Sequence, residues 1–408
     1  MMEIIKRDYY IEKLLNFKNT NVAKVLIGIR KCGKTEILKQ FINIVKTQGD
    51  TVLFYDLNDY DIRTKYIKEG VLYNEIKKNL KQTNKTYIFI DEVQEVERWD
   101  EVVNSLVRNK NIDLYITGSN SKVLSSNLPT ILKGVTVPIY VFPLSFNEIK
   151  DHSSYKGKTD EFILEEYVRY GGMPGRLSFG TEQTLDYLKM VYSEILEVDI
   201  LSKKIINNVD ELIKIYNFIL SNIGRVISTN NISLTLKNHN NTSIKNETVI
   251  KYADWLSAVL LLNKIEIWSE RTKNMLKNYS KYYSQDIGLA NSRADVPFAY
   301  ALENIVLSHL KINGYEVFSY GNNEDKEIDF VAKKNKETIF IQVAYEVVPN
   351  EYDKNGKVLT GNYHREIGNL RELKNSNKKI VISYKNKTYT ENDGIQVINL
   401  LEWLKSIV

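Results

Sequence analysis

Hydrophobic residues in the first third of the chain gather in short runs, and stretches with helical spacing lie between them. The runs are rich in β-branched and aromatic residues, as buried strands are; the clearest four are 22–29, 51–57, 86–90 and 111–117. Segment 71–81 instead repeats its apolar residues every three or four positions, which predicts an amphipathic helix. Buried strands that alternate with helices form a parallel sheet covered on both faces. A last apolar segment, 135–142, completes the α/β domain that we expect over residues 1–150.

The middle of the chain has a different pattern. Residues 151–160 are polar and are typical of a linker, and 161–220 has helical periodicity interrupted by a Gly-Gly-Met-Pro-Gly run. A short helix, a polar turn, a second helix and an apolar strand then follow in order up to Trp268. Helix, turn, helix and β-hairpin is the order of a winged helix. We therefore expect a helical segment with a winged helix over 151–275.

The last part of the chain alternates again between helical and strand patterns. The expected elements are helix 298–313, strands 316–320, 327–332 and 338–345, helix 366–374, strand 379–384 and helix 400–407. This order predicts a second, smaller α/β domain over 276–408.

Composition limits the class of protein more than it identifies one. The chain has 408 residues, of which 43% are hydrophobic and 26% charged, as in ordinary soluble globular proteins. It contains no apolar stretch of 18 residues and no signal-peptide pattern at its start, so we expect a soluble protein without a membrane partner. One cysteine, Cys32, excludes an internal disulfide and favours the cytoplasm. The net charge of +5 does not by itself indicate nucleic-acid binding.

A complete phosphate-loop motif follows the first predicted strand. It reads Gly28-Ile29-Arg30-Lys31-Cys32-Gly33-Lys34-Thr35 and leads directly into a predicted helix. Its glycines let backbone N–H groups turn toward phosphate oxygens, while Lys34 reaches the β- and γ-phosphates and Thr35 ligates Mg²⁺. The alternative is a chance glycine turn before a core helix, which the strand-loop-helix context disfavours. The motif predicts a P-loop NTPase that binds ATP and ADP through Gly28, Arg30, Lys31, Cys32, Gly33, Lys34, Thr35 and Glu36.

Two acidic residues close the third predicted strand. Asp91 and Glu92 follow the apolar run Tyr87–Ile90. Beside a phosphate loop, Asp91 is placed to hold Mg²⁺ and Glu92 to orient the attacking water, which makes Lys34, Asp91 and Glu92 the candidate catalytic residues. The alternative is an ordinary solvated pair of acids at the end of a strand.

The next strand also ends in small polar residues. Thr117, Ser119 and Asn120 would lie at the same edge of the sheet, where one of them can sense the γ-phosphate. We place Ser119 and Asn120 in the predicted nucleotide site. The alternative is a plain strand-to-helix turn with a serine N-cap.

Several of these runs together resemble a bacterial and archaeal family of AAA-type ATPases. The resemblance rests on the phosphate loop and on the runs Phe89–Gln94, Ile116–Ser121, Phe142–Phe146, Tyr170–Pro174, Lys281–Tyr283, Asp286–Leu289 and Glu327–Val331. It implies an AAA-type nucleotide domain, a winged-helix segment and a C-terminal domain of unknown function related to restriction-endonuclease folds. The fold class expected for the whole chain is therefore α/β, with those three parts in that order.

This sequence departs from the resembled family at one charged position. Family members usually carry a Gly-Arg pair before the Pro-Leu-Ser-Phe run, and the corresponding place here reads Lys133-Gly134-Val135. An arginine finger contributes on the order of 10³-fold or more to turnover, and valine carries no charge. Slow hydrolysis, or an arginine supplied by a partner, is the expected consequence.

The nuclease-like part lacks residues that such a site requires. Glu303 and Asp329 have the expected acidic character, but Gln342 and Ala344 stand where a Glu-x-Lys pair would hold Mg²⁺ and activate water. Glu346 shares that face of the strand but lies one pair too far along. The sequence therefore predicts a degenerate nuclease fold, and DNA cleavage is the least favoured function.

The partner of the winged-helix region stays open at the level of sequence. Lys237, His239, Lys245 and Lys251 lie on or near its second helix, but Glu247 and Asp254 dilute their charge. The alternatives are a module that binds duplex DNA and a structural winged helix that packs against the ATPase domain or mediates protein contacts. For the whole chain, a protein partner or a homo-oligomer also stays open. Two hypotheses therefore remain, an ATP-driven switch that acts on DNA or protein, and a nucleotide-responsive binding protein with little turnover.

Overall fold

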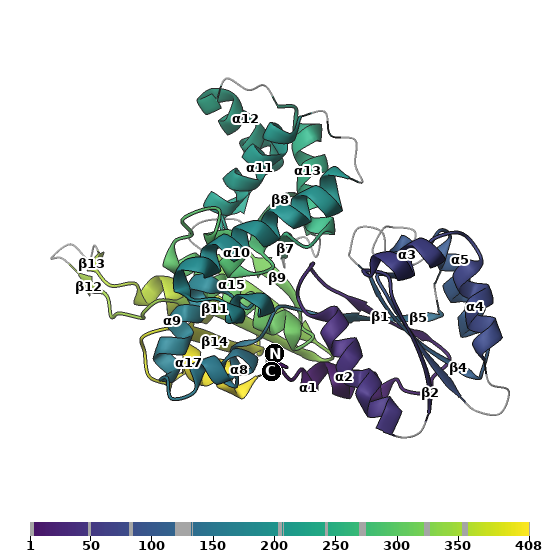
Figure 1. Cartoon of the computed structure of the whole chain (residues 1–408). Helices are drawn as coiled ribbons and strands as arrows, with labels where there is room; N and C mark the ends of the chain where they lie inside the picture. Colours follow the sequence, from purple (N-terminus) through teal and green to yellow (C-terminus); the bar gives the residue numbers. More distant parts are fainter. Residues whose placement is uncertain are drawn as a thin grey trace.

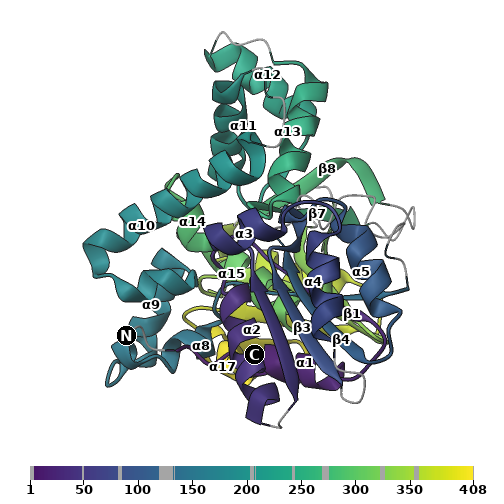
Figure 2. The same cartoon turned by 45° about the vertical axis from the view of Figure 1, so that its right-hand side comes forward.

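The computed structural model of the protein describes residues 4–47, 50–80, 85–118, 132, 134–202, 206, 208–240, 244–268, 275–321, 327–352 and 358–407. One sheet with its helices forms a separate N-terminal lobe, and a second, larger sheet lies beside it (Figure 1). Three helices of the middle segment extend from the second sheet at one end of the molecule, in both views (Figures 1 and 2).

The N-terminal lobe is a parallel α/β domain. Its elements are α1 (Asp8–Asn16), β1 (Ala23–Ile27), α2 (Lys34–Thr47), β2 (Thr51–Asp56), α3 (Tyr60–Tyr66), α4 (Val71–Asn79), β3 (Thr86–Asp91), a 3₁₀ turn (Val93–Glu95), α5 (Trp99–Val107), β4 (Ile112–Gly118) and β5 (Thr136–Tyr140). The next helix, α8 (Phe146–Lys150), packs instead against α9 (Asp160–Tyr170) and α17 (Leu400–Ser406) (Figure 1). The strands run in the order β2-β3-β4-β1-β5, and every neighbouring pair is parallel. Strands β1, β3 and β4 are buried along their whole length, which explains their continuous apolar sequences. The predicted P-loop NTPase sheet is therefore confirmed.

The middle segment is mostly helical. It contains a 3₁₀ turn (Ser153–Tyr155), α9 (Asp160–Tyr170), a second 3₁₀ turn (Pro174–Ser178), α10 (Thr181–Glu194), a π-helix (Ile195–Leu201), α11 (Val209–Ser221), β6 (Val226–Ile227), α12 (Thr229–Asn240), α13 (Asn246–Ala258), β7 (Leu262–Trp268) and β8 (Met275–Ser284). The π-helix continues α10 without a break. Nothing in the hydrophobic pattern predicted it, because the apolar spacing of α-helix and of one π turn is too similar to separate.

The C-terminal part is a second α/β unit. It contains α14 (Ile287–Asn291), α15 (Phe298–Ile312), β9 (Glu316–Tyr320), β10 (Ile328–Lys334), β11 (Glu337–Ala344), β12 (Glu351–Tyr352), β13 (Val358–Thr360), a π-helix (His364–Gly368), α16 (Asn369–Glu372), β14 (Lys378–Ser383), β15 (Tyr389–Thr390), β16 (Gln396–Asn399) and α17 (Leu400–Ser406). The helix expected over 366–374 is thus split between a π turn and one short α turn.

The second sheet joins the middle and C-terminal parts. Its order is β15-β16-β14-β11-β10-β9-β7-β8-β6, so the β7–β8 hairpin continues into the C-terminal strands through the parallel pair β7–β9. Strand β6 pairs with β8, and helices α11, α12 and α13 pack beside this corner. The order of elements agrees with the expected helix, turn, helix and hairpin. The three-domain division at 150 and 275 stays a prediction, and this sheet runs across the second boundary.

Specific polar contacts join α1 and α8 to the C-terminal part of the chain. The Tyr9 hydroxyl donates to the Ile312 carbonyl oxygen over 2.6 Å, and the Asn147 side-chain amide donates to the Ile407 carbonyl oxygen over 2.7 Å. The backbone N–H of Phe146 donates to Nε2 of buried His309 over 3.2 Å, while Nδ1 of that ring lies 2.9 Å from the Ile305 carbonyl oxygen. The ring must therefore be neutral, with its proton on Nδ1.

Protonation of His309 in acid should weaken the contact that this ring makes with Phe146 of α8. Burial lowers the pKa of His309 from its ordinary 6.5 to about 4. In the unfolded chain His309 binds a proton below about pH 6.5, whereas in the folded chain it stays neutral down to about pH 4. The free energy of unfolding therefore falls as the pH drops from 6.5 to 4. We expect the loss to reach about 3 kcal/mol at its lower end. Thermal melting from pH 7 to 4 checks this; His309→Gln, which cannot titrate, should show a smaller slope, and equal slopes would contradict the assignment.

Candidate nucleotide-binding site

The phosphate loop leaves the carboxyl end of β1 and has the conformation that its sequence demands. Gly33 has φ +101° and Lys31 has φ +65°, two left-handed residues that curl the backbone inward. Gly28 is required for a different reason, because a Cβ there would lie 2.2 Å from the Val141 carbonyl oxygen after β5. The loop is therefore pressed against the neighbouring chain and held in a curled shape.

Lys34 is the first residue of α2 and is almost fully buried. Its Nζ donates to the carbonyl oxygens of Gly28 over 3.0 Å and Ile29 over 3.3 Å, which folds the ammonium back over the loop. A carbonyl oxygen is a weaker partner for an ammonium than a phosphate oxygen is. The lysine is thus placed at the center of the loop with partners that an anion can replace.

Three polar side chains from different strands and loops meet at Asp91, the last residue of β3. Thr35 Oγ1 donates to Asp91 Oδ2 over 2.6 Å and Asn58 Nδ2 donates to the same oxygen over 2.9 Å, while the Thr117 hydroxyl donates to Oδ1. Asp91 is fully buried, and burial raises its pKa, although the hydrogen bonds from Thr117 and Thr35 oppose this. Strand β4, which carries Thr117 next to its last residue, separates β3 from β1, so the sheet order itself brings these groups to one edge.

Glu92 lies just beyond the buried strand, in a left-handed conformation with φ +56°. Its backbone N–H donates to Thr117 Oγ1 over 2.9 Å, and its carboxylate accepts a hydrogen bond from the Gln94 side chain. A non-glycine residue in this region is strained and persists where the surroundings hold it. The strained backbone aims a partly exposed carboxylate at the edge of the sheet where the loop begins.

The oxygen ligands at this edge suit Mg²⁺. A hydroxyl and a carboxylate oxygen, those of Thr35 and Asp91, lie 2.6 Å apart, and hard oxygen donors are what Mg²⁺ takes in proteins. Within the described part of the chain, no three His, Cys, Asp or Glu residues form a metal-holding group. Mg²⁺ bound with a nucleotide commonly takes few protein ligands together with the phosphates of the substrate.

Arg7 holds the phosphate loop in place through hydrogen bonds, and the sequence analysis did not identify it as part of the site. Its guanidinium donates to Glu148 Oε1 over 2.6 Å, to the Cys32 carbonyl oxygen over 3.0 Å and to the Phe142 carbonyl oxygen over 2.8 Å. The side chain is 3% exposed. Its position before α1 carries no local signal, because its partners lie 25, 135 and 141 residues away.

Arg30 and Lys31, which lie between the two glycines of the loop, contact acids of the middle segment. Arg30 forms a two-pronged ion pair with Asp199 of the π-helix, with distances of 2.9 Å from Nε to Oδ2 and 3.0 Å from Nη2 to Oδ1. Lys31 Nζ lies 3.7 Å from Glu194 Oε1 at the end of α10. Cys32 is fully buried, and burial raises the pKa of its thiol, so it is a packing residue of the loop.

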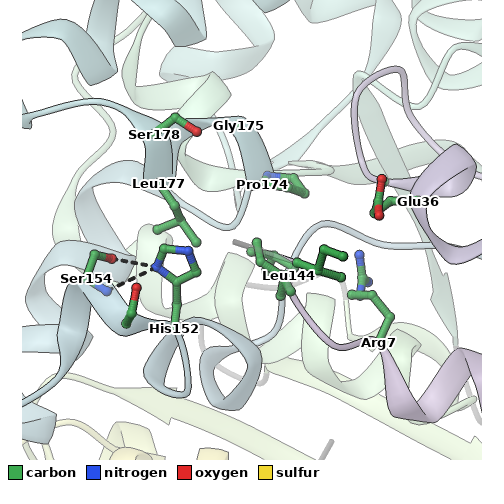
Figure 3. Close-up of a pocket in the computed structure, with 13 residues that line it drawn as sticks. Arg7, Glu36, Leu144, His152, Ser154, Pro174, Gly175, Leu177 and Ser178 are labelled. Carbon is green, nitrogen blue, oxygen red and sulfur yellow. Dashed lines mark hydrogen bonds between the residues drawn. The ribbon is translucent and has the colours of Figure 1, made fainter. Parts of the chain in front are cut away.

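A cavity of about 790 Å³ opens beside the loop, between the two lobes. Gly33 is one of its lining residues. Glu36 and Arg7 lie on one side, and His152, Ser154 and Leu177 lie opposite (Figure 3). The remaining wall is largely apolar and includes Ile4, Ile5, Leu144 and Pro174. Its volume is in the range of small-molecule pockets, and His152 Nδ1 and Ser154 Oγ, 2.8 Å apart, add a polar group at one end.

Part of the predicted site lies outside the described residues. Ser119 and Asn120 do so, and so does Lys133. Thr117, the third sensor candidate, is buried between Asp91 and the backbone of Glu92. Val135 is half-buried and packs against the apolar core on the β1 side of the sheet, so it is a structural residue in this chain.

A second polar cluster lies in the C-terminal sheet, far from the loop in sequence. Lys281 of β8 is buried, and its Nζ lies 2.5 Å from Glu327 Oε1, 3.4 Å from Asp329 Oδ1 and 4.0 Å from Glu303 Oε2. Burial lowers the pKa of Lys281, but the facing carboxylates raise it above its ordinary value overall. The structure thus joins the two predicted acids around a lysine that sequence reasoning missed, whereas Glu346 is exposed elsewhere.

The basic residues of the winged-helix region do not gather around one site. Lys237, Lys245 and Lys251 are exposed, and Lys251 stacks on Trp255 with its Nζ 4.7 Å from the ring center. The side chain of His239 lies outside the described residues. No helix among the described residues has the length and apolar character to cross a bilayer.

Comparison with known proteins agrees with this geometry. A family described as AAA domain matches residues 20–150, and a domain of unknown function matches residues 161–298. The curled loop, the acidic strand end and the sheet order define an AAA-type, ATP-binding P-loop protein.

Two relatives align over almost the whole chain. An uncharacterized protein of Haemophilus influenzae is 32% identical over 412 residues, which cover 98% of each chain. The uncharacterized protein MJ1544 of Methanocaldococcus jannaschii is 28% identical over 428 residues, 99% of this chain and 92% of its own. This protein therefore belongs to the family of AAA-type P-loop ATPases that the Haemophilus protein represents.

Two solved structures are similar over part of the chain. The Aeropyrum pernix ORC1 protein, solved in complex with DNA, has a TM-score of 0.30 and 12% identity and covers 71% of this chain and 92% of its own. DnaA from Aquifex aeolicus, solved with AMPPCP, has a TM-score of 0.33 and 16% identity and covers 63% of this chain and 89% of its own.

Proposed function

We propose that this protein is an ATP-driven conformational switch that hydrolyses ATP with Mg²⁺. The observation that carries the proposal is the convergence of Thr35 and Thr117 on the buried carboxylate of Asp91, 2.6 Å from the Thr35 hydroxyl, at the edge where the phosphate loop begins. Without a cation, a buried acid beside a phosphate loop contributes little to the stability of the fold, because burial raises its pKa and costs free energy. It is useful once a divalent cation lies next to it.

The residues of the loop have separate tasks in this proposal. Lys34 exchanges the carbonyl oxygens of Gly28 and Ile29 for β- and γ-phosphate oxygens. Thr35 and Asp91 hold Mg²⁺, directly or through water. Mg²⁺, when bound there, would supply positive charge that stabilises the phosphates during hydrolysis.

Glu92 orients the water that attacks. The water oxygen bonds to the γ-phosphorus, and the bond from that phosphorus to the bridging oxygen breaks, with its electron pair leaving on ADP. The water's proton passes to Glu92 or to a phosphate oxygen. Thr117 links Asp91 to the backbone of Glu92, so it is suited to report the metal and phosphate to the carboxylate that holds the water.

The cavity beside Gly33 and Glu36 is proposed to hold the nucleoside. It continues the line of the phosphate loop, and its apolar wall suits a flat base, which Leu177 and Pro174 would cover. Both residues belong to the middle segment, whereas the loop belongs to the N-terminal lobe. A nucleotide bound there would contact both parts at once, which supports a switch that opens and closes with the bound nucleotide.

A nucleotide-responsive binding protein with little turnover is the second candidate. The observation in its favour is Val135, an apolar residue in the core where related proteins are expected to carry arginine. In this alternative the same site binds ATP and sets the conformation, and hydrolysis is too slow to matter. The partner on which either form acts is proposed to contact the helices α11 to α13, as DNA or as protein.

Lys34→Ala should weaken ATP binding by about 100-fold or more, because it removes the charge that pairs with two phosphates. Leu177→Arg, on the opposite wall of the cavity, should weaken ATP and adenosine alike. Titration with a fluorescent ATP analogue and Mg²⁺ measures both effects. Lys39→Ala, an exposed position on the same helix, is the matched control and should bind normally. Equal binding by the wild-type chain and Lys34→Ala would overturn the proposal.

A further inference from the structure

Arg30 makes contacts that are not needed to hold the phosphate loop in its curled conformation. Its Nε and Nη2 donate to both oxygens of Asp199 over 2.9 and 3.0 Å, and its Nη1 lies 3.6 Å from Glu194 Oε1. The side chain is 18% exposed and that of Asp199 is 5% exposed. Arg7 already fixes the back of the loop through Cys32. Arg30 instead joins the front of the loop to a different part of the chain, 169 residues away.

The position of Arg30 in the loop is favourable for contact with the terminal phosphate. It is the third residue of the motif, and its guanidinium contacts Asp199 and Glu194 rather than the partners of Arg7. Burial lowers the pKa of Arg30, but Asp199, Glu92 and Glu194 together raise it above the ordinary value. The guanidinium thus stays charged between the acids of the middle segment, while it belongs to the phosphate loop by sequence.

The acids that hold Arg30 lie on a rare element. Asp199 belongs to the π-helix Ile195–Leu201, and Glu194 is the last residue of α10, directly before it. A π turn in a helix is disfavoured relative to α-helix and occurs frequently at functional sites. Here the π turn places two carboxylates from one helix on the same guanidinium. Two carboxylates around a planar fork imitate the oxygens of a phosphate group.

We propose that Arg30 is the arginine of the hydrolysis step, supplied by the phosphate loop itself, and that Asp199 and Glu194 bind it when no γ-phosphate is present. This inference rests on the proposed ATPase function. On ATP binding, the γ-phosphate takes the guanidinium from the two acids. Arg30 then neutralises charge on the γ-phosphate oxygens as the bond to ADP breaks, without itself exchanging a proton.

The exchange has two consequences. Arg30 takes the place of the arginine that the resembled family carries where this chain has Val135. This guanidinium comes from the same chain, so no partner has to supply one. The exchange also makes the contacts of the middle segment depend on the bound nucleotide, because only ATP removes Arg30 from Glu194 and Asp199 at the end of α10. The release of that ion pair is the change that a switch needs at its first step.

A purely structural ion pair makes a different prediction. If Arg30 and Asp199 only brace the fold, loss of either one loosens the loop and weakens ATP and ADP binding in the same direction. If Asp199 competes with the γ-phosphate, loss of Asp199 strengthens ATP binding, loss of Arg30 weakens it, and ADP is hardly affected. The opposite signs separate the two explanations.

The test is calorimetric titration of the full chain with ATPγS and with ADP, in the presence of Mg²⁺. Asp199→Asn should increase the preference for ATPγS over ADP by about tenfold, as for other couplings between sites. Arg30→Met should decrease it by a similar factor and abolish the effect of Asp199→Asn in the double variant. Glu194→Gln should have the same effect as Asp199→Asn but a smaller one. It provides the test if Asp199→Asn does not fold. Glu197→Gln, an exposed acid of the same π-helix, should change nothing.

Turnover gives a second readout. Arg30→Met should lower kcat by about 10³-fold, and Arg30→Lys should recover little of it because an ammonium lacks the fork. Equal losses of ATPγS and ADP binding in Asp199→Asn and Arg30→Met, or normal kcat in Arg30→Met, would overturn this inference and leave the ATPase intact. A wild-type chain that binds neither nucleotide would overturn the proposed function, and this inference with it.

Discussion

Replacing Glu92 by glutamine should reduce steady-state ATP hydrolysis by about 10²- to 10⁴-fold, the range that a positioned general base contributes, and leave ATP binding within about threefold. The change keeps the side chain's size and its contact with Gln94 but removes the charge that polarises water. The left-handed backbone at Glu92 stays as it is, because its N–H is held by Thr117. Binding and catalysis should therefore separate in this variant.

The measurement is phosphate release by the purified protein, with and without duplex DNA, beside Glu92→Gln. The matched control is Glu97→Gln, an exposed acid in the loop after the same strand, which should leave turnover unchanged. Turnover that DNA stimulates, and that the Glu92 variant loses, would favour a switch that acts on DNA. A wild-type rate no higher than that of Glu92→Gln in both conditions would favour the binding protein with little turnover. A Glu92→Gln variant with normal turnover would contradict the role of Glu92.

Lys281→Met should destabilise the protein by about 3–5 kcal/mol, the usual result of removing one partner from a buried ionic cluster. Lys281 is 1% exposed and faces Glu303, Glu327 and Asp329. Without the ammonium, the buried acids of this cluster repel each other and lose their common counter-charge. Burial already raises the pKa of Glu303 and of Asp329 in the wild-type chain, and loss of Lys281 raises them further.

The pH dependence of this variant has a definite sign. Acids whose pKa is raised in the folded state bind protons on folding, so stability is greater at low pH and is lost as the pH rises through the folded pKa. Lys281→Met should therefore be less destabilised at pH 5 than at pH 8, measured by chemical denaturation at both. Lys264→Met, an exposed lysine of β7, is the control. Adding Glu303→Gln and Asp329→Asn should recover part of the loss, and equal destabilisation with and without them would contradict the electrostatic cause.

The consecutive residues of the loop and strands made the N-terminal lobe predictable. A phosphate loop needs glycine at Gly28 and Gly33 and the Lys34-Thr35 pair within eight positions, so the pattern is local and complete in the sequence. The buried strands are also local, because a parallel strand covered on both faces is apolar throughout. The fold class of this lobe, the place of the loop and the acids at the end of β3 followed from these patterns alone.

Shorter elements were harder to find. Helix α3 and strand β15 were not predicted. Tertiary contacts decided these segments, since local propensity is a weak guide where few residues are involved.

By itself, the sequence determined that this chain has a phosphate loop, an acidic strand end and a parallel sheet, because each is written in adjacent residues. Only the tertiary structure decided which distant groups complete the site. Asn58 reaches Asp91 from the turn after β2 and Thr117 reaches it from β4, Asp199 holds Arg30 from 169 residues away, and Lys281 joins acids of a different strand and helix. Such contacts follow from sheet order and from one π turn, neither of which leaves a periodic signal in the chain.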